Sequence, residues 1–150
     1  MGPPPVQPIG IQVARTAKVV SKAFDDALVE AGGSLPIWLV LLSLKAARPG
    51  MQRDLATTVG VEGPTLTHHL NRMEVAGLVQ RTRDPQNRRI HRVELTDAGE
   101  AMFHRLRRAV TAFDGRLRRG VTDAEVRVLA DLLTRLQRNV AEETLSEESW

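Results

Sequence analysis

Several residue types are missing from this sequence, and each absence removes a class of function. The 150 residues include no cysteine and no tyrosine, and aromatic residues make up only 3%. Without cysteine the chain has no disulfide, thiolate metal ligand or cysteine redox switch, which is compatible with a reducing cytoplasm. No apolar run approaches the roughly 18 residues of a membrane-spanning helix. We therefore expect a cytoplasmic protein with no membrane partner.

The sequence also lacks the short motifs of common enzyme and metal sites. It has no glycine-rich phosphate loop, no serine-centred nucleophile elbow and no carboxylate pair in an apolar setting. His68 and His69 are adjacent, so on a helix they point about 100° apart and do not readily share one ion. We expect no enzymatic activity and no cofactor. A metal-responsive regulator is kept as an alternative.

The charge distribution favours an anionic partner. The formal net charge is only +3, but basic residues concentrate in the middle of the chain. Between residues 72 and 92 the only acids are Glu74 and Asp84, against the arginines Arg72, Arg81, Arg83, Arg88, Arg89 and Arg92. The carboxyl end is acidic instead. A basic centre beside an acidic end indicates an anionic ligand at the centre.

Apolar residues spaced by threes and fours predict about six helices. The expected helices cover residues 9–31, 34–47, 51–59, 64–76 and 97–119, and a last one that begins after Thr122. Leu55, Ala56 and Val59 would be the buried positions of the short third helix. Gly77 and Gly120 stand where helices end in a left-handed residue. Thr122 and Glu125 have the spacing of a capping box.

The third and fourth helices have the pattern of a helix-turn-helix pair, with Gly60 at the tight corner. On the fourth helix Leu66, Leu70 and Met73 share the inner face. The outer face carries hydrogen-bonding side chains that suit base edges and phosphates. The residues predicted to enter the major groove are Pro64, Thr65, Thr67, His68 and Arg72.

Residues 79–95 alternate in polarity around the turn sequence DPQN, as in a β-hairpin. A hairpin after a helix-turn-helix is the wing of a winged helix, and arginines at its tip suit the minor groove. Arg88 and Arg89 are the candidates. One of them could instead brace the wing by pairing with Asp84 or Glu62, and the sequence leaves open which one.

The first, fifth and sixth helices carry more apolar surface than one small lobe can cover, which predicts a homodimer built from both chain ends. The expected organisation is an extended leader (1–8), an N-terminal dimerisation helix (9–33), a winged helix-turn-helix lobe (34–99), C-terminal dimerisation helices (100–145) and an acidic tail (146–150). The fold class is therefore mainly α with a small β-hairpin wing.

These segments together resemble the MarR family of bacterial winged-helix transcription factors. The matching pieces are the corner RDLATTVGVEGPTLTHHLNRMEVAGLV, the wing RTRDPQNRRIHRVELT and the following TDAGE. The family wing reads D-P-x-D-R-R before L-T-x-x-G. Two positions depart from the family pattern: Asn87 replaces the wing aspartate, and His68 stands where an arginine is common.

The resemblance implies a homodimer that binds a pseudo-palindromic operator in double-stranded DNA, usually as a repressor that an aromatic or phenolic ligand releases. It places the ligand cleft between the dimerisation helices and the DNA-binding lobe. Arg15, Trp38 and Leu42 are candidate lining residues, although for Trp38 a place in the core is favoured over a ligand contact. A winged-helix module that binds proteins instead of DNA remains the other alternative.

Overall fold

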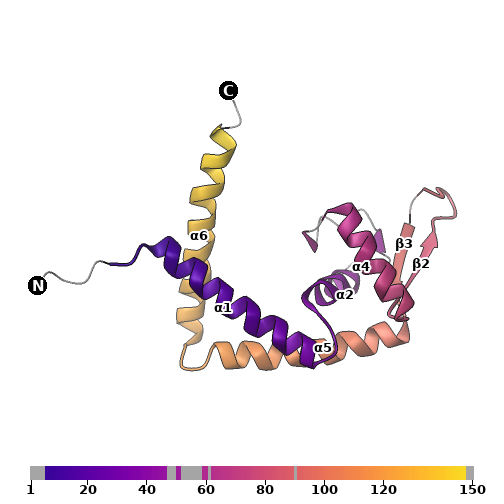
Figure 1. The fold of residues 1–150 in the computed structure, drawn as a ribbon, viewed down its shortest axis with the longest axis horizontal. Helices are drawn as coiled ribbons and strands as arrows, with labels where there is room; N and C mark the ends of the chain where they lie inside the picture. The colour runs from indigo at the N-terminus through magenta and orange to yellow at the C-terminus, as the bar shows by residue number, and fades with distance from the viewer. Residues whose placement is uncertain (1–5, 47–49, 52–58, 61, 90, 148–150) are drawn as a thin grey trace, which may run out of the picture. The chain divides into compact units, whose positions relative to one another are not determined.

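The structure is a computed structural model. It describes residues 6–46, 50–51, 59–60, 62–89 and 91–147. The elements, in chain order, are α1 (Ile9–Glu30), α2 (Leu35–Ala46), β1 (Gly50–Met51), α4 (Gly63–Val75), β2 (Val79–Arg83), β3 (His91–Leu95), α5 (Asp97–Leu117) and α6 (Asp123–Glu147) (Figure 1). The chain is thus mainly helical with an antiparallel β-hairpin wing, as the sequence predicts.

One predicted helix begins differently. Residues 50–51 form the short strand β1, so Met51 is a strand residue and not the start of the third helix. The rest of that expected helix, including Leu55 and Ala56, lies outside the described residues. Val59 at its end is helical and buried, and Gly60 has the left-handed φ of 77° expected at the corner.

The wing belongs to a three-stranded antiparallel sheet with the order β1-β3-β2. In the hairpin, Val79 lies opposite Leu95, Arg81 opposite Val93 and Thr82 opposite Arg92. β1 adds to the other edge of β3, where Gly50 lies opposite Val93. The sheet therefore ties the segment before the helix-turn-helix directly to the wing.

The core holds α4 against α2 and the sheet. Leu66, Leu70 and Met73 are buried, which confirms the predicted inner face of α4. They join a cluster that includes Leu41 of α2 and Val93 of β3. Because these contacts occupy one side of α4 completely, its opposite side is left for solvent or a ligand.

A glycine-centred turn sets the direction in which the chain leaves α4. Gly77 has a φ of 75°, and the N–H groups of Gly77 and Leu78 donate to the carbonyls of Glu74 and Met73. This is the hydrogen-bond pattern of a Schellman cap. The Thr96 hydroxyl donates to the Gly77 carbonyl, so the start of α5 closes over the same turn.

The chain divides into two compact units, residues 1–113 and 114–150. The second unit contains the end of α5 and all of α6. Thr122 and Glu125 exchange hydrogen bonds at the start of α6, in line with the predicted cap. Exposed apolar side chains line one face of α6: Leu129, Leu132, Leu133, Leu136 and Val140.

No single helix in the described part of the chain is long and apolar enough to cross a membrane. The α1 and α2 helices meet the length and composition test only when taken together, across a bend of 76°.

Candidate nucleic-acid interface

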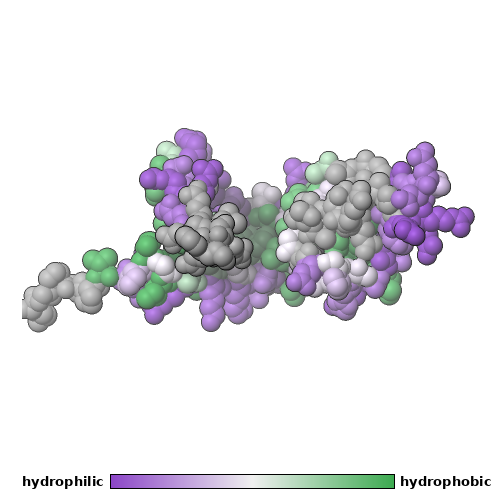
Figure 2. All heavy atoms as spheres, turned by 90° about the horizontal axis from the view of Figure 1, so that it is seen from above, coloured by the Kyte–Doolittle hydropathy of each residue, from purple (hydrophilic) through white to green (hydrophobic). Residues whose placement is uncertain are grey.

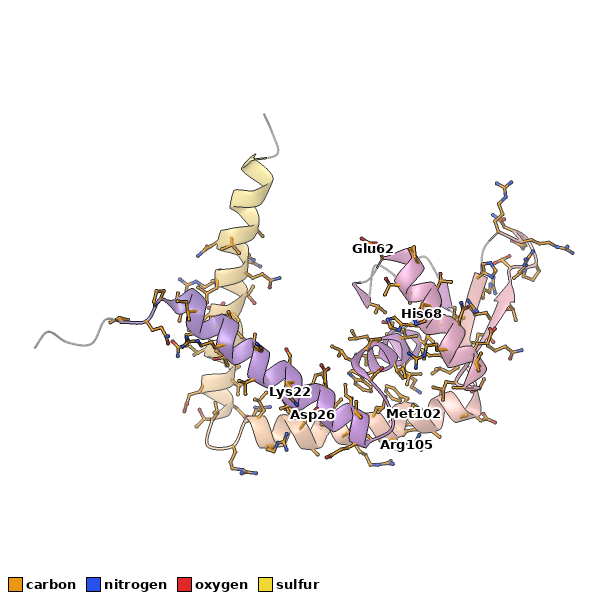
Figure 3. All side chains as sticks on the ribbon, in the orientation of Figure 1. Lys22, Asp26, Glu62, His68, Met102 and Arg105 are labelled. Carbon is orange, nitrogen blue, oxygen red and sulfur yellow. The ribbon has the colours of Figure 1, made fainter. Side chains whose placement is uncertain are left out.

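The outward face of α4 presents hydrogen-bonding side chains to solvent. Pro64, Thr65, His68 and Arg72 are exposed, and Thr67 is half-buried, so the five residues predicted from the sequence lie on the accessible side of α4. The Thr67 hydroxyl donates to the Gly63 carbonyl at 3.0 Å. In Figure 3, Glu62 lies at the start of α4 and His68 further along it. We call these five residues the reading surface.

The turn of the wing is organised by one carboxylate. Asp84 is buried, and its Oδ1 accepts the backbone N–H groups of Gln86 at 2.8 Å and Asn87 at 3.3 Å. Its Oδ2 accepts from Arg92 Nε at 3.0 Å and Nη2 at 2.8 Å. The Gln86 hydrogen bond and then the Arg92 guanidinium hold the pKa of Asp84 below its ordinary value.

The arginine that braces the wing is Arg92, which the sequence interpretation did not select. Among the described residues, Arg88 and Arg89 form no ion pair with Asp84 or Glu62. Both are exposed in the turn, where the Arg89 backbone N–H donates to Asn87 Oδ1 at 3.2 Å. The hairpin register explains the pairing: Thr82 lies opposite Arg92, and Asp84 is two residues from Thr82 on the same face. Both tip arginines are therefore left for a ligand.

Replacing Asp84 with asparagine is expected to lower the urea midpoint of unfolding at neutral pH, because the Arg92 pair loses its charge. A depressed carboxylate pKa stabilises the folded state above the unfolded value of about 3.9, and this contribution is lost as the pH falls through the folded value. The difference in urea midpoint between wild type and Asp84→Asn should therefore have its largest value above about pH 5 and shrink below about pH 4. A difference that stays constant down to pH 3 would contradict this role.

A second arginine missed by the sequence interpretation connects the wing to the reading helix. Arg81 of β2 contacts Glu74 of α4 at 3.2 Å and also donates to Asn71 Oδ1. The Arg81 hydrogen bond lowers the pKa of the Glu74 carboxyl. No short motif indicates this contact, because it depends on how the turn after α4 folds β2 back along the helix.

The hairpin end of the first unit is hydrophilic. Figure 2 shows purple side chains gathered there, and Figure 3 shows nitrogen-tipped side chains projecting from the hairpin. The arginines that face solvent in this region are Arg72, Arg83, Arg88 and Arg89. Such a surface attracts an anionic polymer without requiring any one sequence.

The three candidate effector residues have different surroundings. Trp38 is 8% exposed and stacks on Phe103 of α5, with ring centroids 5.5 Å apart. Leu42, one turn further along α2, is 43% exposed. Arg15 is exposed on α1. Trp38 thus contributes to the core whether or not one of its edges also meets a ligand.

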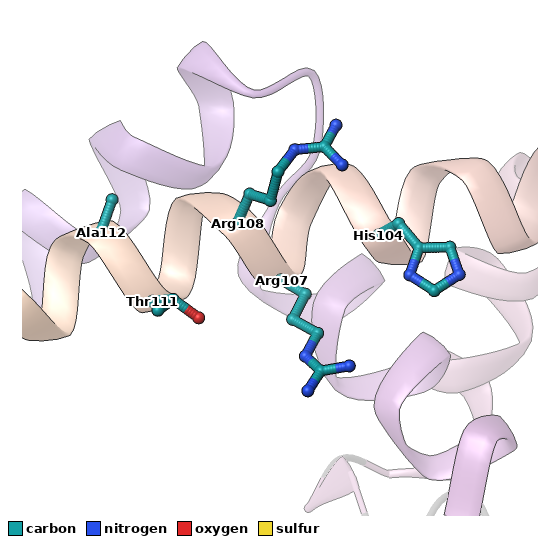
Figure 4. Close-up of a pocket in the computed structure, with 5 residues that line it drawn as sticks. All are labelled: His104, Arg107, Arg108, Thr111 and Ala112. Carbon is teal, nitrogen blue, oxygen red and sulfur yellow. The ribbon is translucent and has the colours of Figure 1, made fainter.

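An open hollow lies on the surface of α5, lined by His104, Arg107, Arg108, Thr111 and Ala112. Figure 4 shows Arg107 and Arg108 extending from the helix in different directions, so the hollow is exposed helix surface and not a closed pocket. Within the described ranges, no three histidine, aspartate or glutamate side chains are grouped closely enough to hold a metal ion.

Comparison with known proteins decides what this arrangement is. Residues 34–91 match the profile of the MarR family. The helix-turn-helix and wing of this chain are of the MarR type. This match makes the protein a DNA-binding transcription regulator and not an enzyme.

Solved MarR-type structures resemble most of the chain, beyond the matched segment. A MarR-family regulator from Rhodococcus sp. RHA1 is 29% identical, with a TM-score of 0.74 and coverage of 85% of this chain and 91% of that chain. The repressor CouR bound to a 23-mer DNA duplex is also 29% identical, with a TM-score of 0.78 and the same coverage. CouR from Rhodococcus jostii RHA1 bound to p-coumaroyl-CoA is 29% identical, with a TM-score of 0.73 and coverage of 87% and 92%.

Proposed function

We propose that this MarR-family protein is a cytoplasmic repressor that binds a pseudo-palindromic operator as a homodimer and releases it on binding a small aromatic or phenolic ligand. The observation that carries the proposal is the accessible polar face on α4 together with Arg88 and Arg89 at the wing tip, which form no ion pair with any other described residue. CouR is a repressor seen on duplex DNA, which supports the same role here.

Within this proposal, the reading surface enters the major groove and the wing arginines enter the minor groove. Base contacts from α4 specify the sequence, and arginine contacts at the wing position the protein. Asp84 acts indirectly, by fixing the turn that presents Arg88 and Arg89. Glu62 is the N-cap of α4, with its carbonyl accepting the Leu66 N–H at 3.0 Å, and we assign it a supporting role at the base of the wing.

The proposed dimer is built by residues 9–33 and 100–145, while residues 34–99 form the DNA-binding lobe. In α1, Ile9, Ile11 and Val13 are exposed, and α6 has the apolar face described above. Two apolar surfaces at the chain ends suit a two-fold interface, because a dimer covers both of them at once. The two reading helices would then meet half-sites about one helical turn apart.

For the effector, we propose a site near Arg15, Trp38 and Leu42. The cationic Arg15 and the exposed Leu42 suit a ligand with an anionic group and an aromatic ring. CouR bound to p-coumaroyl-CoA, an acyl thioester with a phenol ring, supports this ligand class. A ligand seated beside α1 and α2 would bias how the two DNA-binding lobes of a dimer are spaced.

The test is selection of bound fragments from genomic DNA with the full chain, at about 150 mM salt. An enriched inverted repeat with half-sites about 10 base pairs apart supports the proposal. Retention without an enriched sequence would indicate a nonspecific architectural protein. Retention that barely responds to salt would favour a protein-interaction module, since DNA binding predicts a linear fall of log affinity with log salt.

Replacing Arg89 with alanine is expected to weaken binding to every DNA sequence by at least about fivefold, or ~1 kcal/mol. The loss should be uniform, because the arginine is attracted by the negative potential of the minor groove and not by a particular base. The matched control is Arg127→Ala, an exposed arginine on α6. Fluorescence anisotropy over a salt series checks both, and unchanged affinity in Arg89→Ala would remove the wing contact from the proposal.

In contrast, replacing His68 or Thr67 should mainly change which sequence is preferred. Both lie on the face of α4 that is proposed to meet base edges, where losing a contact costs about 1–3 kcal/mol at one base pair. Repeating the selection with His68→Ala and Thr67→Ala measures this directly. An unaltered consensus in both variants would place the reading surface elsewhere.

A further inference from the structure

Arg81 holds the side chains of two α4 residues from the neighbouring strand. Its Nε and its backbone N–H both donate to Glu74 Oε2, at 3.2 Å and 3.1 Å, and its Nη2 reaches Glu74 Oε1 at 3.5 Å. The same Nη2 donates to Asn71 Oδ1. The Arg81 side chain is only 19% exposed, so the guanidinium is held against the helix and does not extend into solvent.

The chemistry of arginine determines how the Asn71 amide is oriented. A guanidinium has five N–H donors and no acceptor, so only the oxygen of an amide can face it favourably. Turning the amide by 180° would place its NH2 group against Nη2 and set donor against donor. With Oδ1 facing Arg81, the Nδ2 group and its two N–H bonds point away from the guanidinium.

Asn71 lies on the part of α4 that is proposed to meet DNA. It is exposed, and it follows His68 by three residues, which places both on one face of the helix. Its neighbour Arg72 already belongs to the reading surface. Arg81 itself is engaged by Glu74 and Asn71 of α4, so in this proposal it acts on DNA through Asn71.

We propose that Asn71 is a specificity-determining residue that offers DNA hydrogen-bond donors alone, and that Arg81 is the positioning residue that imposes this. The inference rests on the proposed operator binding and names what one residue of the interface reads. It makes Asn71 differ from an unrestrained asparagine, which can use its oxygen and nitrogen together.

The Nδ2 donors of Asn71 limit the bases that this residue can recognise. In the major groove an asparagine pairs with adenine by accepting from N6 and donating to N7 at the same time. Oδ1 keeps a second lone pair, but Arg81 holds the oxygen toward the wing, so in our proposal only Nδ2 faces the base and the bidentate pair is disfavoured. Guanine offers two adjacent acceptors, N7 and O6, and thymine offers O4, whereas adenine sets its N6 amino donor beside its one acceptor N7 and cytosine offers only an amino donor. Asn71 should therefore favour a guanine or thymine.

The experiment is selection from a randomised duplex library with the full chain as wild type, Asn71→Ala, Arg81→Met and Glu74→Gln. Wild type should prefer guanine or thymine over adenine by about fivefold or more at one symmetric pair of positions. Asn71→Ala should remove that preference and leave the other positions unchanged. Arg81→Met should admit adenine at the same positions, because the amide is then free to turn. Glu74→Gln, which still accepts from Arg81, should keep the wild-type preference.

The preferred base at these positions would not change if Arg81 only stabilised the fold. Adenine selected by wild type at the Asn71-dependent positions would overturn the inference, and so would an Asn71→Ala consensus identical to wild type. If wild type enriches no sequence, the proposed function fails together with the reading role of Asn71. A different result, in which an operator is enriched but none of its positions responds to Asn71→Ala, would overturn only the inference about Asn71.

A measurement without DNA tests the contact itself. If Arg81 binds Asn71 Oδ1, the urea midpoints of Asn71→Ala, Arg81→Met and the double variant should not be additive, because the second substitution removes a contact already lost. Asn71→Asp keeps an acceptor for Arg81 and should retain the wild-type midpoint while weakening DNA binding at least tenfold. Additive midpoints would overturn the positioning role of Arg81 whatever the protein binds.

Discussion

Replacing Leu133 of α6 with aspartate is expected to convert the proposed dimer into folded monomers. Leu133 is 45% exposed in the single chain and lies among the other apolar side chains of its helix face. Burying a leucine side chain contributes about 1.5–3 kcal/mol, and a two-fold interface loses this contribution twice. An unpaired carboxylate at the interface adds a further cost. The dimer dissociation constant should therefore rise by at least about a hundredfold, or ~3 kcal/mol.

The matched control is Thr134→Asp, which introduces the same residue at the next position. Thr134 is exposed and turned about 100° from Leu133, away from the apolar face. Sedimentation velocity at micromolar protein should show monomers for Leu133→Asp and wild-type behaviour for Thr134→Asp. Operator affinity should fall by roughly a hundredfold in the first variant, because a monomer loses the effective concentration of its second half-site. A dimer that survives Leu133→Asp would place the interface on another surface.

The sequence predicted the elements whose signals are local. The alternation of residues 79–95 located both strands, and Gly77 and Gly120 are left-handed as expected at helix ends, with φ values of 75° and 76°. These features depend on a few neighbouring residues and on backbone sterics. In contrast, β1 is two residues long and has no periodic pattern, so only its pairing with β3 identifies it as a strand.

The candidate site was less predictable because its contacts cross between elements. The arginines near Asp84 in sequence are Arg88 and Arg89, yet the side chain that reaches it is Arg92, through the register of the hairpin. Counting that register from the turn could have identified Arg92. No such count was available for Arg81 and Glu74, whose contact requires the direction set by the Gly77 turn. Trp38 could be assigned to the core only once Phe103 was placed beside it.

Replacing Gly99 with alanine should be among the most destabilising single changes in the first unit. Gly99 is buried in the first turn of α5, and a Cβ there would lie 2.0 Å from the Leu78 carbonyl oxygen. That carbonyl is backbone and already accepts the Thr96 N–H at 3.1 Å, so it cannot move without breaking the junction of β2 with α5. Overpacking typically costs about 1–3 kcal/mol, and a clash with backbone should lie at the upper end of that range.

The control for Gly99→Ala is Gly115→Ala, in the same helix. A Cβ at Gly115 meets nothing within 4 Å, so alanine there should stabilise the helix by up to about 1 kcal/mol. Opposite shifts of the urea midpoint, measured at one protein concentration, are expected for two identical substitutions in α5. A Gly99→Ala variant as stable as wild type would show that α5 can slide away from Leu78. The wing would then be less firmly attached to α5 than its hydrogen bonds indicate. In that case the DNA affinity of the Gly99→Ala variant should also equal that of wild type.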